Sequence, residues 1–294
     1  MPEGSPLVVA IGAVLWDVFP DGDRLGGAPA NFAVHAKALG AQSAMVSCVG
    51  DDGRGKAAIE ILGGRGVATD AIQVDPCRPT GTVPVTLSNG QPSYNIVEDV
   101  AWDAIVWHAE LAVLAQSAHA ICFGTLDQRQ NGSRQTIQKF LDATSPNCLR
   151  VLDVNFRQHY HGQDVVLASL KRADVLKLND EEIPLLREYV GGDQDDDAFL
   201  WAVWQQFDLR CIVLTLGAKG CRIVSDYGIF DVAGEKTTVE NTVGAGDAFA
   251  AAFVLNWLKG ADLQVCAQHA NAVGGFVTTQ DSGMPELPAH FRIH

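Results

Sequence analysis

The sequence predicts an α/β protein built on a mostly parallel sheet that helices cover on both faces. The first observation behind this prediction is a series of short apolar runs along the chain, each of the length of a buried strand. The second is that segments with helical spacing of apolar residues lie between these runs. Strands that alternate with helices are joined by crossovers, so they run parallel and are buried on both sides. We therefore expect a doubly wound sheet.

The N-terminal part of the chain begins this alternation. Residues 7–14 form a continuous apolar run and are expected to be a buried strand. Residues 29–39 have helical spacing, start with a proline and are followed by a glycine, which favour the start and the end of a helix. Residues 44–49 return to a strand pattern, and residues 56–62 return to a helical one.

The segment over about residues 71–100 interrupts the alternation. Short extended runs at residues 82–87 and 93–97 flank Asn89-Gly90, and Asn-Gly between two strands predicts a hairpin. These strands cannot easily join a parallel sheet. We expect them to form, together with about residues 14–26, a small antiparallel β lid over the strand ends. The alternative is a decorated edge of the main sheet.

After residue 100 the alternation becomes regular. The expected strands are residues 120–123, 149–154, 175–178 and 211–216, and the expected helices are residues 133–141, 165–171 and 196–206. The length suits one large domain, so we expect a single domain over residues 1–294 with the lid as its appendage. Ligands of such sheets bind beyond the carboxyl ends of the strands.

Composition and charge exclude several classes of partner. The formal net charge of -14 argues against nucleic acid or an anionic membrane as a partner. No basic residue precedes Leu7 and no apolar run approaches membrane-spanning length, so we expect neither a signal peptide nor a membrane helix, and a cytoplasmic location. The seven cysteines are scattered without a CxxC pair, which favours buried thiols over disulfides or a zinc site.

The run from Glu240 to Phe249 is the most informative part of the sequence. Gly244, Ala245 and Gly246 precede an apolar helical pattern, and a helix that begins at such a turn offers unpaired N–H groups to an anion. Asp247 lies at the same helix start. It is either an ordinary helix cap or a base that accepts a proton from a substrate hydroxyl while the N–H groups stabilise a transferring phosphoryl group.

Two other nucleotide-binding motifs fail on their spacing. Residues 50–56 have the glycines and lysine of a phosphate-binding P-loop, but Ala57 follows where a hydroxyl is needed for magnesium. A dinucleotide fingerprint at Gly244 would need a third glycine where Phe249 stands. His159 and His161 lack a third ligand with suitable spacing, so a histidine-based metal site has little support.

Several separated motifs together resemble the PfkB carbohydrate kinases, the ribokinase-like sugar and nucleoside kinases. The matching segments are Gly26-Gly27-Ala28-Pro29-Ala30-Asn31, Leu39-Gly40, Val49-Gly50-Asp51-Asp52, Asp153-Val154-Asn155-Phe156-Arg157, Asn179-Asp180-Glu181-Glu182, Thr215-Leu216-Gly217-Ala218-Lys219-Gly220 and the run that ends at Asp247. Each motif is weak alone, but their joint order is highly specific. The resemblance implies a ribokinase-like fold, and residues 15–20 with Ala101-Trp102-Asp103 resemble the fructokinase branch.

The resemblance implies a catalytic role for five residues. Asp247 would be the base that activates the sugar hydroxyl, and Gly244, Ala245 and Gly246 would form the anion hole. Arg157 would offer donors to a phosphate or sugar oxygen.

The sugar itself would contact five further residues of the matching motifs. These are Asp17, Gly27, Asn31, Asp153 and Asn155. Asp153, Asn155 and Arg157 alternate after a buried strand, so we expect their side chains to share one face. The alternatives are a turn-initiating role for Asp17 and a helix-capping role for Asn31.

The nucleotide would lie along the second half of the chain. The resemblance implies ATP and Mg²⁺, with contacts from Asn179, Glu182, Thr215, Gly217, Gly220 and Asn271. Glu182 would reach Mg²⁺ through water. The alternatives are a helix cap formed by Asn179 and Glu182, and a hairpin turn over residues 215–220, which is compatible with nucleotide binding.

One departure from the family pattern concerns a monovalent cation. Asn241 and Val243 lie where relatives hold K⁺, but the family has an aspartate at position 241 and a different tail after residue 280. An amide brings no charge to the site, so we expect weak or absent K⁺ activation.

The sequence therefore predicts an ATP-dependent sugar kinase that phosphorylates a primary hydroxyl, with fructose as the first candidate substrate. Ribose, 2-keto-3-deoxygluconate and a nucleoside are the alternatives. A non-catalytic sugar-binding regulator on the same fold is the alternative from another class, although the intact Asp247 disfavours it. Relatives also suggest a homodimer formed through the lid strands, since exposed strand edges invite pairing.

Overall fold

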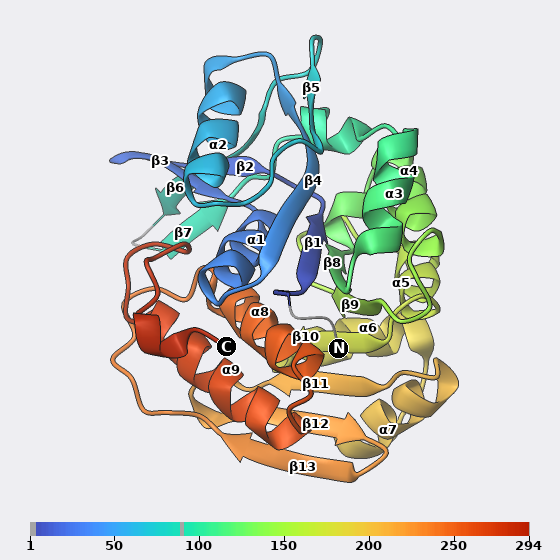
Figure 1. The fold of residues 1–294 in the computed structure, drawn as a ribbon. Helices are drawn as coiled ribbons and strands as arrows, with labels where there is room; N and C mark the ends of the chain where they lie inside the picture. Colours follow the sequence, from blue (N-terminus) through green and yellow to red (C-terminus); the bar gives the residue numbers. More distant parts are fainter. Residues whose placement is uncertain (1–3, 89–90, 294) are drawn as a thin grey trace.

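A sheet of nine strands forms the centre of the molecule (Figure 1). The structure is a computed structural model that describes residues 4–88 and 91–293. In spatial order the strands are β13 (Gly228–Ala233), β12 (Gly220–Ser225), β11 (Cys211–Thr215), β10 (Val175–Asn179), β9 (Leu149–Asp153), β8 (Ala120–Gly124), β1 (Leu7–Ile11), β4 (Gln42–Gly50) and β5 (Ile72–Asp75). The strands from β11 to β5 are parallel, and β12 and β13 continue the sheet as an antiparallel hairpin.

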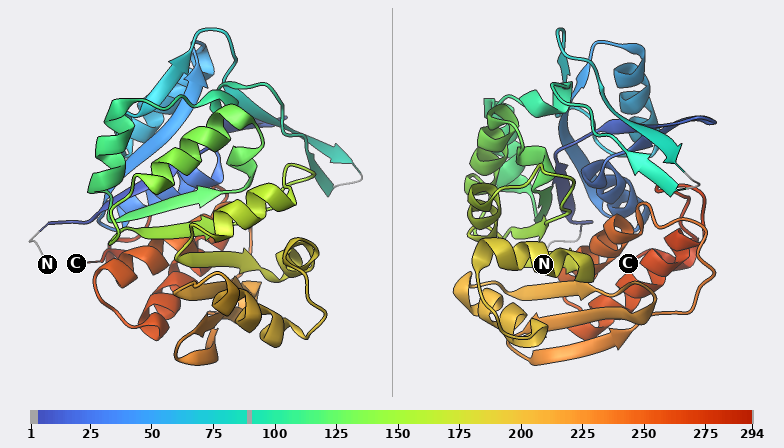
Figure 2. Two further views of the ribbon diagram at one scale, coloured as in Figure 1. Left: turned by 90° about the vertical axis from the view of Figure 1, so that its right-hand side faces the viewer. Right: turned by 180° about the vertical axis from the view of Figure 1, so that it is seen from behind.

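Helices cover both faces of this sheet, as the alternation predicted (Figure 2). One face carries α1 (Ala28–Ala38), α2 (Gly53–Gly64), α8 (Ala245–Leu258) and α9 (Leu263–Thr278). The other face carries α3 (Ala109–Ser117), α4 (Asn131–Asp142), α5 (Gln163–Leu170), α6 (Ile183–Val190) and α7 (Asp196–Gln206). In β1, Val8 packs toward the first group and Val9 toward the second, because successive side chains of a strand point to opposite faces.

A second, smaller sheet stands apart from the first, as expected of the lid. Its order is β3 (Gly22–Gly26), β2 (Leu15–Phe19), β6 (Gly81–Ser88) and β7 (Gln91–Tyr94). The expectation of a purely antiparallel lid was wrong, because β2 and β6 run parallel. Part of the segment expected in the lid also belongs elsewhere, since β5 pairs in parallel with β4 at the edge of the main sheet. The expected Asn89-Gly90 turn lies outside the described residues.

A buried ion pair lies next to the chain segment that leaves the smaller sheet after β7. The guanidinium of Arg129 donates to the carboxylate of Asp103 at 2.7 and 2.8 Å, and both side chains are at most 3% exposed. Arg129 also donates to the carbonyl of Val97 and lies 4.0 Å above the ring of Trp102. A buried charge is stable only when it is paired, so these contacts fix the position of the segment that follows β7.

Three further observations concern the described residues as a whole. None of their helices combines the length and the apolar character that crossing a membrane would need. All seven cysteines are free, and six of them are buried while Cys77 is exposed. The carboxyl ends of β1, β8, β9 and β10 meet the first turns of α1 and α8, and the polar residues predicted to be functional gather there.

Candidate active site

The first turn of α8 has the geometry of an anion site. Gly244 precedes the helix in the left-handed conformation, with φ of 78°. A side chain at this position would overlap the carbonyl group of Gly283, so only glycine fits. The helical hydrogen bonds begin with Ala248 N–H donating to Gly244 O at 2.9 Å. The N–H groups of Gly246 and Asp247 come earlier, so the helix offers them no acceptor and they can bind an anion.

Asp247 projects from this turn toward α1. Its Oδ2 accepts a hydrogen bond of 2.7 Å from Nδ2 of Asn31. The pKa of Asp247 is raised to about 7, because burial and, to a smaller extent, the negative charge of Asp153 outweigh the opposite effects of Lys177, Asn31 and Arg157. A carboxylate with a pKa near neutrality is a stronger proton acceptor than an ordinary aspartate, and it is still deprotonated in part of the molecules at pH 7.

A second carboxylate lies beside it at the end of β9. Asp153 accepts a hydrogen bond of 2.7 Å from Nζ of Lys177, which lies on the neighbouring strand β10. The side chains are 7% and 11% exposed. Burial lowers the pKa of Lys177, but the charges of Asp153, Asp247 and Glu182 outweigh it, and the net shift is upward. The ammonium group therefore stays charged at neutral pH.

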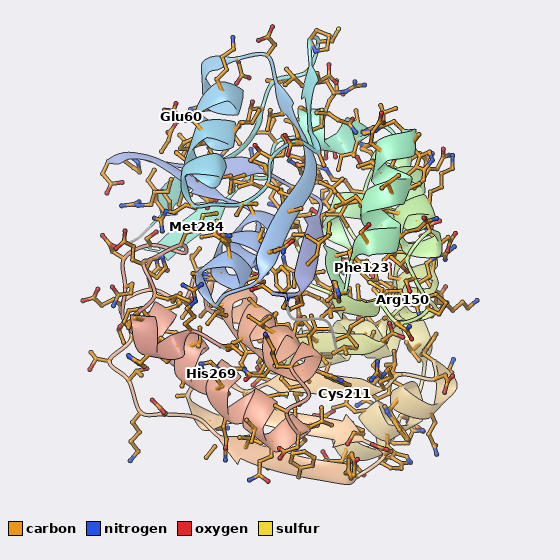
Figure 3. The ribbon with its side chains drawn as sticks, in the orientation of Figure 1. Glu60, Phe123, Arg150, Cys211, His269 and Met284 are labelled. Atoms are coloured by element: carbon orange, nitrogen blue, oxygen red, sulfur yellow. The ribbon has the colours of Figure 1, made fainter. Side chains whose placement is uncertain are left out.

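A cavity of about 10 Å³ shows where these groups converge. Its polar lining comes from Asp127, Asp153, Asn155 and Asp247, and its apolar lining from α1, β8 and α8, including Phe123, which is labelled in Figure 3. The volume is that of about one water molecule, so it marks the meeting point of the polar groups rather than the space for a substrate.

The small sheet brings one more carboxylate toward the site. The pKa of Asp17 on β2 is raised to about 6, because burial outweighs the charges of Arg157 and Arg24, which act to lower it. Asp17 lies against Gly26, where a Cβ would be 2.6 Å from its Oδ2. Arg157 is exposed and acts electrostatically on both Asp17 and Asp247, which places its charge between the lid and the first turn of α8.

The arrangement suits phosphoryl transfer to a hydroxyl group. A basic carboxylate, a row of free N–H groups and two cations lie together, so proton removal and stabilisation of developing negative charge are possible at one place.

Comparison with known proteins agrees with this chemistry. The sequence pattern of the pfkB family carbohydrate kinases matches residues 21–290. The chain belongs to the PfkB family of carbohydrate kinases. A sugar kinase of Pyrococcus horikoshii is 33% identical over 301 residues, covering 96% of this chain and 93% of that protein. Fructokinase-2 of Oryza sativa subsp. japonica is 30% identical over 310 residues, covering 96% and 91%.

A solved structure supports the same conclusion. The crystal structure of the Pyrococcus horikoshii sugar kinase in complex with ATP superposes with a TM-score of 0.80 and 29% identity, covering 94% of each chain. As a PfkB kinase, this protein is a phosphotransferase that acts on a sugar, and its fold is the ribokinase-like fold that the motifs implied.

The structure brings together most of the residues expected around the sugar. Gly27 caps α1 with φ of 105°, where a side chain would overlap the carbonyl oxygen of Ala13. Asn31 lies inside α1 and binds Asp247, so the helix-capping alternative for Asn31 was wrong. Asp17 lies inside β2, so the turn alternative was wrong as well. The contacts of these residues with a sugar stay a prediction.

The reason given for grouping Asp153, Asn155 and Arg157 was wrong. The strand β9 ends at Asp153, and Asn155 has a positive φ of 41°, so the alternation of an extended strand does not continue. Asp153 and Asn155 nevertheless both line the cavity, while Arg157 is exposed beside it. The end of β9 positions Asp153, and the loop that follows the strand positions Asn155 and Arg157.

Asn179 and Glu182 form a helix cap, as the alternative for this pair stated. Oδ1 of Asn179 accepts from Glu182 N–H at 2.9 Å, and the Glu182 carboxylate accepts from the N–H groups of Asn179 and Phe156 at 2.8 and 2.9 Å. Both carboxylate oxygens are therefore engaged. Glu182 would reach Mg²⁺ only through coordinated water, which Mg²⁺ readily keeps. Within the described ranges no group of three or more His, Cys, Asp or Glu is placed to hold a metal ion.

The residues expected near the nucleotide lie along the antiparallel end of the sheet. Gly217 and Gly220, with φ of 56° and 99°, form the turn from β11 into β12, which confirms the hairpin over residues 215–220. Thr215 donates its hydroxyl to Leu178 O at 3.3 Å. Asn271 donates to the carbonyls of Val232 and Ala233 at 3.1 and 3.2 Å, so its amino group supports the end of β13. Their contacts with ATP stay a prediction.

The two residues expected at a cation site have other partners. Oδ1 of Asn241 accepts from Val243 N–H at 3.0 Å, and Nδ2 donates to the carbonyl of Asp281 at 3.3 Å. The amide of Asn241 thus donates to one backbone carbonyl of the tail, and weak K⁺ activation stays a prediction.

Sequence reasoning missed three polar residues of low exposure near the site. Lys177 interrupts an apolar strand, which was a visible signal. Asp127 accepts from Ala13 N–H at 2.8 Å, and burial raises its pKa to about 6. His35 binds the carbonyl of Gly283 at 2.9 Å, behind the first turn of α8. Asp127 and His35 lie in segments without a motif that would have identified them from the sequence.

Proposed function

We propose that this kinase transfers the γ-phosphoryl group of ATP to a primary hydroxyl of a small sugar, with fructose as the first candidate. The observation that carries the proposal is the carboxylate of Asp247, which lies at the unpaired N–H groups of α8 and has a pKa of about 7. The ATP complex of the Pyrococcus horikoshii protein and the similarity to the Oryza sativa fructokinase support the choice of donor and acceptor. Ribose, 2-keto-3-deoxygluconate and a nucleoside are the alternatives.

Each residue has a defined part in this reaction. Asp247 accepts the proton of the attacking hydroxyl, and Asn31 keeps its carboxylate oriented through the 2.7 Å hydrogen bond. The N–H groups of the first turn of α8 stabilise the negative charge that develops on the phosphoryl oxygens. Mg²⁺, when bound, neutralises charge on the nucleotide phosphates, and Glu182 would approach it through water.

The smaller sheet would close over the sugar and exclude water. Asp17 on β2 would bind a sugar hydroxyl, and Arg157 would hold the transferring group from the loop after β9.

We also propose that two copies of the chain pair through the edge strands β3 and β7 of the smaller sheet, since β2 and β6 fill the interior of that sheet. Sedimentation analysis at micromolar concentration should give a dimer, and a stable monomer contradicts this pairing. We place the kinase in the cytoplasm, where ATP is available.

A panel of sugars tests the proposal. ADP release is measured with ATP, Mg²⁺ and fructose, ribose, 2-keto-3-deoxygluconate or a nucleoside, for the wild type and for Asp247→Asn. We expect turnover with fructose and a loss of about 10² to 10⁴ in kcat for Asp247→Asn, because an amide cannot accept the proton.

The exposed Asp70 provides a matched control, since Asp70→Asn makes the same change away from the site and should leave turnover intact. Sugar binding without any turnover by the wild type would favour the non-catalytic regulator. Undiminished turnover by Asp247→Asn would remove the proposed base.

A further inference from the structure

Lys177 lies at the centre of the site, and no motif drew attention to it. In β10, Leu176 and Leu178 pack on the face that carries α3 to α7, whereas Val175 packs on the face that carries α8. Side chains of a strand alternate, so Lys177 points toward α8. Its cross-strand neighbour on β9 is Asp153, which accepts its hydrogen bond.

The ammonium group is adjacent to the first turn of α8. A Cβ added to Gly246 would lie 2.9 Å from Nζ of Lys177. In an α-helix the Cα–Cβ bond is tilted toward the amino end, so Nζ lies on the side of Gly246 where the free N–H groups of α8 point. The absence of a side chain at position 246 therefore leaves room for the lysine head group at the edge of the anion site.

Two of the three donors of this ammonium group are unused. Within the described part of the chain, its only hydrogen bond goes to Asp153. The side chain is only 11% exposed, so little solvent reaches it to satisfy the remaining donors. A buried cation with free donors, next to free backbone N–H groups, is a second and independent feature that calls for an anion at this place.

The surrounding charges show why a cation is needed there. Asp153, Asp247 and Glu182 all act electrostatically on Lys177, so three carboxylates share one buried cation. A phosphoryl group carries further negative charge into this cluster. Without Lys177 the carboxylates would repel it, and the exposed Arg157 would be the remaining cationic side chain that compensates.

We propose that Lys177 is a catalytic residue of this kinase, whose ammonium group donates hydrogen bonds to the phosphoryl group during its transfer while remaining paired with Asp153. No proton leaves the ammonium group in this step. The inference rests on the proposed function, because the phosphoryl group must lie at the first turn of α8. The alternative is that Lys177 only neutralises Asp153 and so stabilises the fold.

Steady-state kinetics of Lys177→Met separate these roles. We expect kcat to fall about 10² to 10³-fold, as for the loss of one preorganised donor to a developing charge, with less than a threefold change in the KM for the sugar. Lys171→Met is the matched control, since Lys171 is exposed, and it should keep wild-type kinetics. A kcat of Lys177→Met within threefold of the wild type, with Asp247→Asn inactive, would overturn the role of Lys177 and leave the proposed function intact.

A double variant is the control for loss of folding in Lys177→Met. Removal of one partner of a buried ion pair destabilises a protein strongly, whereas Lys177→Met/Asp153→Asn removes both charges of the pair. Because Asp153 is itself expected to contact the sugar, the double variant reports on folding alone, and it should regain the free energy of unfolding that Lys177→Met loses. A Lys177→Met sample that denaturant unfolding shows to be fully folded, and whose kcat is within threefold of the wild type, would overturn the inference.

Rebuilding the amine gives an independent readout. Lys177→Cys alkylated with 2-bromoethylamine carries an amine at nearly the length of lysine, and we expect it to regain at least tenfold in kcat over the unmodified variant. The wild type treated in the same way controls for the other cysteines, of which Cys77 is exposed. No gain in kcat on alkylation, in a sample with the correct mass and fold, would count against the proposal.

Discussion

Replacing Gly244 by alanine tests whether the first turn of α8 is the anion site. Gly244 has φ of 78°, a left-handed conformation that costs an alanine roughly 1 to 2 kcal/mol. The added Cβ would also lie only 2.7 Å from Cα of Gly283 and would overlap its carbonyl group. The tail around Gly283 or the start of α8 must therefore shift. Together the two effects should lower the free energy of unfolding by about 2 to 4 kcal/mol.

The shift of the helix start should also affect catalysis. The free N–H groups of the first turn stabilise the transition state only if they point at the phosphoryl oxygens, and the loss of one such donor costs about 10² to 10³ in kcat. We therefore expect kcat of Gly244→Ala, measured by ADP release at saturating sugar and ATP, to fall by roughly that factor. The KM for the sugar should change less, because we expect the sugar to bind on the other side of Asp247.

A second glycine provides the control for this experiment. At Gly64, the last residue of α2, an added Cβ meets no atom within 4 Å and φ lies outside the left-handed region. Gly64→Ala should therefore leave kcat unchanged and stabilise the fold by about 0.5 to 1 kcal/mol, as measured by denaturant unfolding. Wild-type kcat in a well-folded Gly244→Ala variant would refute the argument that this turn forms the anion site.

Four further predictions concern the buried titratable groups and the tail. Because Asp247 must be deprotonated to act as a base and has a pKa of about 7, kcat/KM should fall tenfold per pH unit below about pH 6, and a profile that is flat down to pH 5 would contradict this. Asn31→Ala removes a hydrogen bond that lowers this pKa, so the acid limb should move to higher pH, and a move to lower pH would exclude this contribution of Asn31. Burial lowers the pKa of His35 from 6.5 to about 4, so between these pH values the unfolded chain binds a proton that the folded chain does not bind. Relative to His35→Gln, the wild type should therefore lose about 3 kcal/mol of unfolding free energy between pH 7 and pH 4, as measured by denaturant titration. An unchanged difference between the two proteins would mean that His35 titrates normally. Replacing Na⁺ by K⁺ should change kcat less than twofold, because both polar atoms of the Asn241 side chain are already bonded to backbone, and a strong K⁺ dependence would contradict this.

The fold was largely predictable because its signals are local. The apolar runs around residues 120–123 and 211–216 became β8 and β11 with the expected crossovers between strands. The errors fell on the lid, where short strands carry weak patterns. Nothing in the residues around Ile72 showed that β5 would pair with β4, or that β2 and β6 would run parallel, because strand pairing depends on partners far away in the sequence.

The candidate site was predictable where the backbone geometry requires a particular type of residue. A glycine is required at Gly244 by a positive φ and a close approach, so the pattern is visible in the sequence. The roles of isolated polar residues were less visible. Asn31 could have been an ordinary cap, and Lys177 could have been an exposed residue of an edge strand, until the sheet order placed each of them beside a carboxylate.

The sequence by itself determined the family, the α/β class and the position of the phosphate-binding turn, since each depends on periodicity or on glycine geometry within a few residues. The tertiary structure decided which side chains meet. Asn31 and Asp247 are 216 residues apart and form a 2.7 Å hydrogen bond, and Lys177 is paired with Asp153 across two strands. The raised pKa of Asp247 has the same origin, because burial and neighbouring charge arise only when distant segments close around a carboxylate.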